Sequence, residues 1–109
     1  MKKIVFIFFN VLLLLIISAC GNNKLTKVKV AEVTHSVFYA PQYIAIELGY
    51  FKDEGLEIEL INAGGADKVM AGLLSNDIDV GFSGPEATIY VYNNGQENYM
   101  INFCQLTKR

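Results

Sequence analysis

The sequence predicts the α/β fold class, with a doubly wound, mostly parallel sheet in one small domain. Short apolar stretches that favour strands alternate with stretches whose apolar residues recur at helical spacing. The connections between them are short, and three of them carry small or polar residues where a strand gives way to a helix. Strands and helices that alternate in this way favour parallel strands joined by helical crossovers.

The start of the chain has the pattern of a secretory leader. Met1-Lys2-Lys3 is basic, residues 4–17 are apolar apart from Asn10, and Ile17-Ser18-Ala19-Cys20 follows and resembles a bacterial lipobox. The apolar run is shorter than the ~20 residues that a membrane-spanning helix needs. The lipobox resemblance implies that residues 1–19 are a signal peptide and that Cys20 is lipidated. An ordinary signal peptide and an uncleaved anchor helix are the alternatives.

Residues 20–27 are expected to be a lipidated tether, and residues 28–109 the folded domain. The lipid would hold the protein on the extracytoplasmic face of the cell membrane. The formal net charge is −2 and becomes more negative when Lys2 and Lys3 leave with the signal peptide, which argues against nucleic acid as a partner. Cys104 lies in an apolar stretch, so we expect a buried free thiol.

The first strand and the first helix follow the tether. Alternating lysine and valine predict a strand over residues 27–33. Pro41 suits the first turn of a helix, which we expect to continue to Leu48 and to stop at Gly49. Residues 50–55 should form a turn that first packs on this helix and then faces solvent.

The same order of elements repeats through the rest of the chain. Apolar and acidic residues alternate over residues 56–61, which predicts a strand at or near the sheet edge with its acids exposed. A helix is expected over residues 66–75, a third strand over 78–82 and a third helix over 85–92. Residues 99–103 are predicted to form a fourth strand.

Three strand-to-helix turns share one design and mark the candidate site. They are residues 34–41, 62–67 and 83–86, and each carries small or polar residues. The carboxyl ends of parallel strands meet at one edge, so the three turns should line one crevice. Three helix N-termini at this edge would favour an anionic or strongly polar ligand group. The candidate side chains are the hydrogen-bonding Thr34, His35, Ser36 and Ser83 and the aromatic Phe38 and Tyr39.

Each of these features also has a purely structural interpretation. His35, the only histidine, could support the fold, and Phe38 and Tyr39 could pack against the helix that follows them. Gly64-Gly65 could be a plain turn, and Glu86 could complement its helix dipole. The sequence has no metal-ligand cluster, hydrolase triad, dinucleotide fingerprint or P-loop, so we predict no cofactor, no metal and no catalytic residue.

Four segments together resemble a known family. Residues 34–45 (THSVFYAPQYIA), 48–56 (LGYFKDEGL), 64–68 (GGADK) and 79–87 (DVGFSGPEA) are similar to the first lobe of substrate-binding proteins of ABC transporters. Within these proteins, the resemblance is to the SsuA/THI5-like group, also described as NMT1/THI5-like, which includes binders of aliphatic sulfonates, taurine, nitrate and thiamine-pyrimidine precursors. The resemblance covers essentially all of residues 27–109.

The resemblance implies a partial first lobe of a type II periplasmic-binding-protein fold. Proteins of this family close two α/β lobes on a small-molecule ligand and deliver it to an ABC permease with an ATPase partner. Carried over position by position, the implied ligand contacts are His35, Phe38, Tyr39, Gly64, Gly65, Ser83, Gly84 and Glu86.

The chain departs from the family because it ends near its fourth expected strand. We therefore expect a fragment of a solute-binding lipoprotein that lacks the opposing wall of its cleft. The alternatives are a THI5-like enzyme that makes a pyrimidine precursor, against which the secretion signal argues, and a small lipoprotein with a structural or interaction role.

Overall fold

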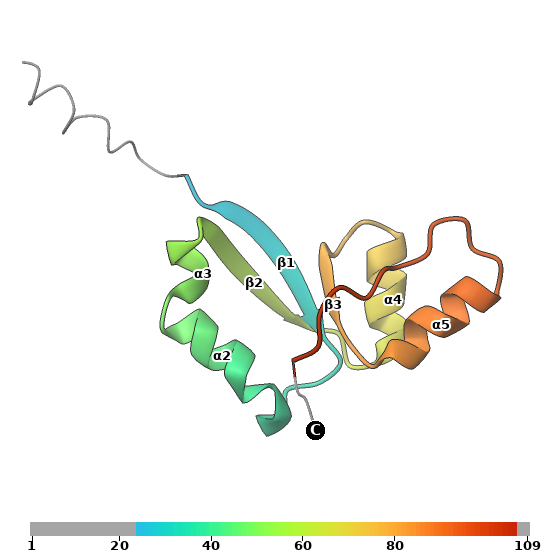
Figure 1. Ribbon diagram of the computed structural model, residues 1–109, viewed down its shortest axis with the longest axis horizontal. Helices are drawn as coiled ribbons and strands as arrows, with labels where there is room; N and C mark the ends of the chain where they lie inside the picture. The colour runs from blue at the N-terminus through green and yellow to red at the C-terminus, as the bar shows by residue number, and fades with distance from the viewer. Residues whose placement is uncertain (1–23, 107–109) are drawn as a thin grey trace, which may run out of the picture.

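The computed structural model describes residues 24–106. The predicted signal peptide, Cys20 and the first part of the tether lie outside the described residues. Three strands and five helical segments follow one another in the order β1, η1, α2, α3, β2, α4, β3, α5 (Figure 1). Their bounds are β1 Thr26–Glu32, η1 Val37–Tyr39, α2 Ala40–Glu47, α3 Tyr50–Asp53, β2 Leu56–Asn62, α4 Ala66–Leu74, β3 Val80–Phe82 and α5 Pro85–Asn93.

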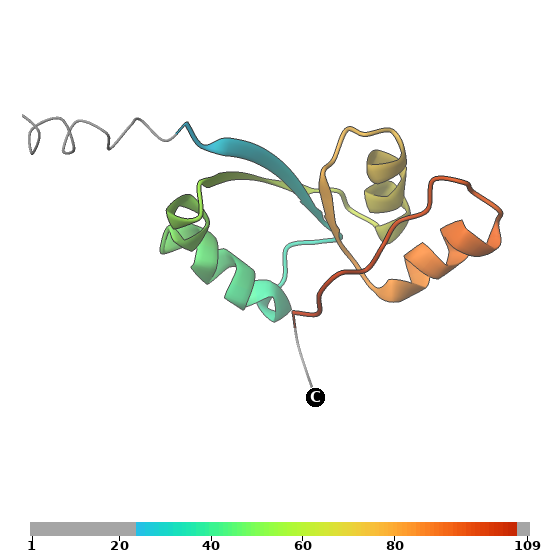
Figure 2. The same cartoon turned by 45° about the horizontal axis from the view of Figure 1, so that its top comes forward.

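The three strands form one parallel sheet with β1 in the centre, in the order β2-β1-β3. β1 pairs with β2 along its whole length, and its last three residues pair with β3. The crossovers from β1 to β2 and from β2 to β3 run in opposite directions, and right-handed crossovers then place their helices on opposite faces. Figures 1 and 2 accordingly show β3 between α2 and α4. The predicted doubly wound α/β architecture is confirmed, and it is consistent with part of a periplasmic-binding-protein fold.

Opposite charges line the pairing of β1 with β2. The register sets Lys27 beside Glu57 and Lys29 beside Glu59, and all four residues are exposed. Neighbours of opposite charge on adjacent strands favour this register over a one-residue slip. β2 is an edge of this sheet, as its alternating acids predicted.

The buried core is small and lies between α4 and the sheet. Ala31, Val69 and Met70 are buried, and eight partly buried residues pack against them. Gly81 lets α4 approach β3 closely, since a Cβ at this position would lie 2.6 Å from side-chain atoms of both Val69 and Leu73. The apolar spacing of residues 66–75 predicted a helix with one buried face. That face of α4 packs on the sheet, and Gly81 makes the close contact possible.

Two elements between residues 48 and 82 differ from the prediction. Residues 50–53 form a short helix, α3, where a turn was expected, and Gly49 begins it with a left-handed φ of 79°. The third strand begins at Val80 rather than Ile78, because the Ile78 N–H donates to the Gly72 carbonyl instead of to the sheet.

The predicted fourth strand is absent, and that prediction was wrong. Residues 99–103 have no regular structure, and Ile101 and Phe103 are 78% and 75% exposed. Strand preference reflects packing on a half-buried surface, which these side chains do not have here. Instead, the Asn102 side chain donates to the Thr88 hydroxyl of α5. Cys104 is exposed in the same segment, so the expectation of a buried thiol was also wrong.

Within residues 24–106, no helix has the length and apolar character needed to cross a membrane.

Candidate ligand site at the carboxyl edge of the sheet

The strand register brings three loops to one edge of the sheet. Glu32, the last residue of β1, pairs with Asn62 of β2 on one side and with Phe82 of β3 on the other. These are also the last residues of their strands, so the loops that follow leave the sheet at the same level. The three turns singled out in the sequence therefore share the carboxyl edge, where α/β sheets bind ligands.

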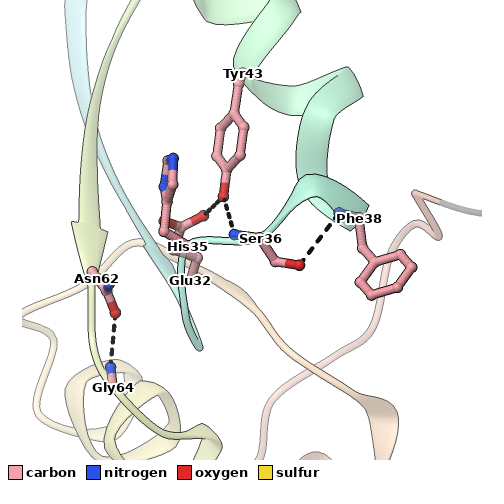
Figure 3. Close-up of polar contacts among 7 residues, drawn as sticks. All are labelled: Glu32, His35, Ser36, Phe38, Tyr43, Asn62 and Gly64. Atoms are coloured by element: carbon pink, nitrogen blue, oxygen red, sulfur yellow. Dashed lines mark hydrogen bonds and ion pairs between the residues drawn. The ribbon is translucent and has the colours of Figure 1, made fainter.

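The central residue at this edge is a buried acid that the sequence reasoning did not single out. Glu32 is 1% exposed, and both of its carboxylate oxygens have partners. Oε2 accepts a 2.6 Å hydrogen bond from the Tyr43 hydroxyl (Figure 3), and Oε1 lies 3.0 Å from Nδ1 of His35. A signal was present, because Glu32 has the same strand parity as the half-buried Val28 and Val30. An acid at an apolar position of a central strand is a candidate for a polar network.

Tyr43 links this acid to the loop after β1. Its hydroxyl donates to Glu32 and accepts from the Ser36 N–H at 3.1 Å (Figure 3). Partial burial, together with the hydrogen bond to Glu32, raises the pKa of Tyr43 above its ordinary 10.0. The His35 ring stacks on the Tyr43 ring, with centroids 4.4 Å apart and planes 18° apart. The cluster of Glu32, His35 and Tyr43 thus fixes the loop against α2.

The two aromatic residues of the first loop separate into different roles. Tyr39 is half-buried and packs edge-on against Phe82, with centroids 4.5 Å apart, so it fits the structural interpretation. Phe38 is 76% exposed and does not staple the following helix. The Ser36 hydroxyl accepts from the Phe38 N–H at 3.3 Å and so caps the short η1 helix. Phe38 is left free to contact a ligand.

The second loop is a glycine turn held by an asparagine. The Gly64 N–H donates to Oδ1 of Asn62 at 3.2 Å, and Gly64 has a left-handed φ of 74° (Figure 3). Gly65 precedes α4, and the Asp67 carboxylate lies over the face of Gly65 where a side chain would stand. Gly64 thus meets a backbone requirement of the turn and is exposed to solvent, whereas Gly65 has an extended backbone and is close only to the Asp67 side chain.

The third loop begins α5. Gly84 is its N-cap residue and provides no side-chain cap, and Pro85 follows in the first turn. The Glu86 carboxylate folds back against Gly84. This position at the positive end of the helix dipole agrees with the structural interpretation of Glu86. The Ser83 hydroxyl makes one weak contact, a 3.4 Å hydrogen bond to the adjacent Gly84 carbonyl, and can easily be exchanged for a ligand group.

A cavity of about 620 Å³ opens beside the third loop. It brings together three of the predicted site residues, Tyr39, Ser83 and Gly84. The other wall is the irregular segment 101–106. His35, Phe38, Gly64, Gly65 and Glu86 do not line it. The eight predicted residues are therefore divided along this edge of the sheet. Three line the cavity, His35 belongs to the Glu32 cluster, Gly64 and Gly65 form the second turn, and Phe38 and Glu86 belong to none of these.

Among residues 24–106, no group of three or more histidine, cysteine or acidic side chains is placed to hold a metal ion. The groups found at this edge are hydrogen-bonding side chains, the exposed ring of Phe38 and the starts of helices α4 and α5. Groups of these kinds line small-molecule sites in proteins.

A parallel sheet with open loops at one carboxyl edge defines the class: a doubly wound α/β lobe that exposes the edge at which such sheets bind ligands. Comparison with known proteins agrees, because the family described as "NMT1/THI5 like" matches residues 37–101. The chain belongs to this NMT1/THI5-like family. It is also 48% identical over 100 residues to a protein of Bacillus subtilis (strain 168) named "Putative binding protein YtlA".

That similarity covers 91% of this chain and 30% of the relative, so the chain spans less than a third of the relative's length. No solved structure gives a significant match.

Proposed function

We propose that this chain is the first, ligand-binding lobe of a solute-binding lipoprotein that serves an ABC importer. Its family, and the name of the relative as a binding protein, support a binding role. The observation that carries the proposal is the register of Glu32 with Asn62 and Phe82, which gathers three ligand-competent loops at one edge. No catalytic step is assigned to any residue.

The ligand in this proposal is a small organic nutrient. The chemical classes are a thiamine-pyrimidine precursor, an aliphatic sulfonate, taurine or, among inorganic ions, nitrate. The exposed ring of Phe38 suits a flat molecule. An anionic group at the helix starts after Gly65 and Gly84 would have to displace the carboxylates of Asp67 and Glu86 that lie there. The permease with its ATPase is the proposed partner, and a second lobe would supply the opposing wall of the site.

Binding is tested by NMR titration of the ¹⁵N-labelled full chain with one representative of each ligand class. NMR is suited to this test because a lobe that supplies one wall of the ligand site is expected to bind weakly. We expect one ligand to shift the amide signals of residues 34–39, 63–65 and 83–86. Phe38→Ala should reduce this response, whereas Tyr90→Ala, which alters an exposed side chain of α5, should not. Shifts confined to other parts of the chain would contradict the proposed site, and micromolar affinity would contradict the need for a second wall.

The membrane anchor is tested separately. Globomycin, which blocks lipoprotein signal peptidase, should cause an unprocessed precursor to accumulate, and labelled palmitate should be incorporated. Cys20→Ala should abolish the label, and Cys104→Ala is the matched control because Cys104 is the only other cysteine. A chain that stays unlabelled in the cytoplasm would favour the THI5-like enzyme over the lipoprotein.

A further inference from the structure

Glu32 occupies a position from which it can control the hydrogen-bonding character of the candidate site. Its carboxylate is buried at the carboxyl end of the central strand, and His35 and Tyr43 are its side-chain partners. The His35 side chain, in contrast, is 71% exposed. The buried Glu32 carboxylate is therefore linked to the exposed His35 ring by one hydrogen bond.

The proton positions in this cluster follow from its contacts. The Tyr43 hydroxyl accepts from the Ser36 N–H, so its own proton is directed to Oε2 of Glu32. A carboxylate has no proton to donate, and its second oxygen must accept as well. The proton between Oε1 and His35 therefore lies on Nδ1 of the histidine.

We propose that Glu32 is a specificity-determining positioning residue, which fixes the Nδ1–H tautomer of His35 and so makes Nε2 a hydrogen-bond acceptor for the ligand. A neutral imidazole has one donor and one acceptor nitrogen, and the partner of one nitrogen decides the role of the other. Within residues 24–106, Nε2 has no hydrogen-bond partner, and the titratable groups in contact with the ring are Glu32 and Tyr43.

This assignment narrows the chemical class of ligand group that can contact Nε2, and this step rests on the proposed binding function. An acceptor at Nε2 recognises an N–H or O–H donor, such as an amino group on a flat ring, and disfavours a sulfonate or carboxylate at this point. Stacking of His35 on Tyr43 keeps the ring orientation fixed, so the acceptor has a defined direction. An anionic ligand group would have to bind elsewhere along the edge.

The tautomer is measured directly by ¹⁵N NMR of the full chain at pH about 9, where an ordinary imidazole is neutral. His35 is the only histidine, so the spectrum contains one ring. We expect a protonated Nδ1 and an unprotonated Nε2 in the wild type. Glu32→Gln should shift the population toward Nε2–H, the tautomer that free histidine prefers, whereas Tyr43→Phe keeps the carboxylate and should retain Nδ1–H. An Nε2–H ring in the wild type, or an unchanged ring in Glu32→Gln, would overturn the proposal.

The ligand assignment is tested with two probes that differ in one donor group, 4-aminopyrimidine and 4-methylpyrimidine. At pH about 9, as in the tautomer measurement, the amino probe should bind the wild type about 3- to 10-fold more tightly, as one net hydrogen bond predicts. Glu32→Gln should remove this preference. If the two probes bound with equal affinity while the Nδ1–H tautomer was confirmed, only the assignment of a donor group to the ligand would be overturned. Failure of both probes to bind would overturn it together with the ring-binding part of the proposed function, and the tautomer measurement would remain valid.

Discussion

The Tyr43 hydroxyl donates a 2.6 Å hydrogen bond to the Glu32 carboxylate and thereby joins helix α2 to the end of the central strand. The two residues are eleven positions apart, and the loop between them carries His35 and Phe38. Since the same hydroxyl also accepts from the Ser36 N–H, one side chain holds both the residue before this loop and a residue inside it. The conformation of the first candidate ligand loop therefore depends on a contact between a buried acid and a half-buried phenol.

Removing this hydroxyl should destabilise the fold. Tyr43→Phe keeps the ring stacked on His35, but it leaves one oxygen of the buried Glu32 without its donor, and an unsatisfied buried acceptor is costly. We expect the melting temperature, followed by circular dichroism, to fall by several degrees. Tyr90→Phe is the matched control because Tyr90 is 70% exposed, and it should melt like the wild type. Equal melting temperatures for all three chains would mean that water replaces the phenol at no cost.

The raised pKa of Tyr43 predicts the alkaline behaviour of the same contact. Burial and Glu32 favour the neutral phenol in the folded state, so the folded pKa lies above the ordinary 10.0. The contribution of Tyr43 to stability is then complete below about pH 10 and is lost as the pH rises through the folded pKa. Titration of ¹³Cζ-labelled tyrosine by NMR should show a signal that ionises above pH 10.0 and is absent from Tyr43→Phe. Glu32→Gln should lower this pKa, and an unchanged value would assign the shift to burial alone.

A methyl group at Gly81 should disrupt the contact of α4 with β3. The Cβ of an alanine would lie 2.6 Å from side-chain atoms of Val69 and Leu73, which is closer than van der Waals contact allows. We expect Gly81→Ala to lower the free energy of unfolding in urea by about 1–3 kcal/mol, as overpacking of a core does. Leu73→Ala removes one of the clashing side chains, so the double variant should lose less than the sum of the two single losses. Additive losses would show that α4 moves aside instead.

The sequence predicted the elements with strong local patterns. Alternation over residues 56–61 and apolar spacing over 66–75 led to β2 and α4, because each pattern reflects one buried and one exposed face. The segment 99–103 misled the same reasoning, since its β-favouring residues have no surface to pack on. A strand pattern states what a segment could bury, and the surroundings decide whether it does.

The candidate site was predictable in its position and only partly in its residues. Turn chemistry identified the loops at His35, Gly64 and Ser83, and parallel pairing placed them at one edge. Glu32 was missed because no turn signal marks the last residue of a strand, and its partners come from a loop and a helix that tertiary packing brings together. Which predicted residues face the cavity beside Ser83 likewise depends on segment 101–106, whose placement no local pattern determines.

Phe38 and Tyr39 are neighbours, and their substitution should separate ligand binding from stability. Phe38 is 76% exposed, so Phe38→Ala should change the free energy of unfolding by less than about 0.5 kcal/mol while it weakens ligand binding. Tyr39 packs edge-on against Phe82, so Tyr39→Ala should cost about 1–3 kcal/mol of stability and weaken binding through the displaced loop. Urea unfolding and NMR titration of both variants give the two quantities. If Phe38→Ala left binding unchanged, the exposed ring would have no role in the site, and recognition would rest on the Glu32 cluster and the third loop.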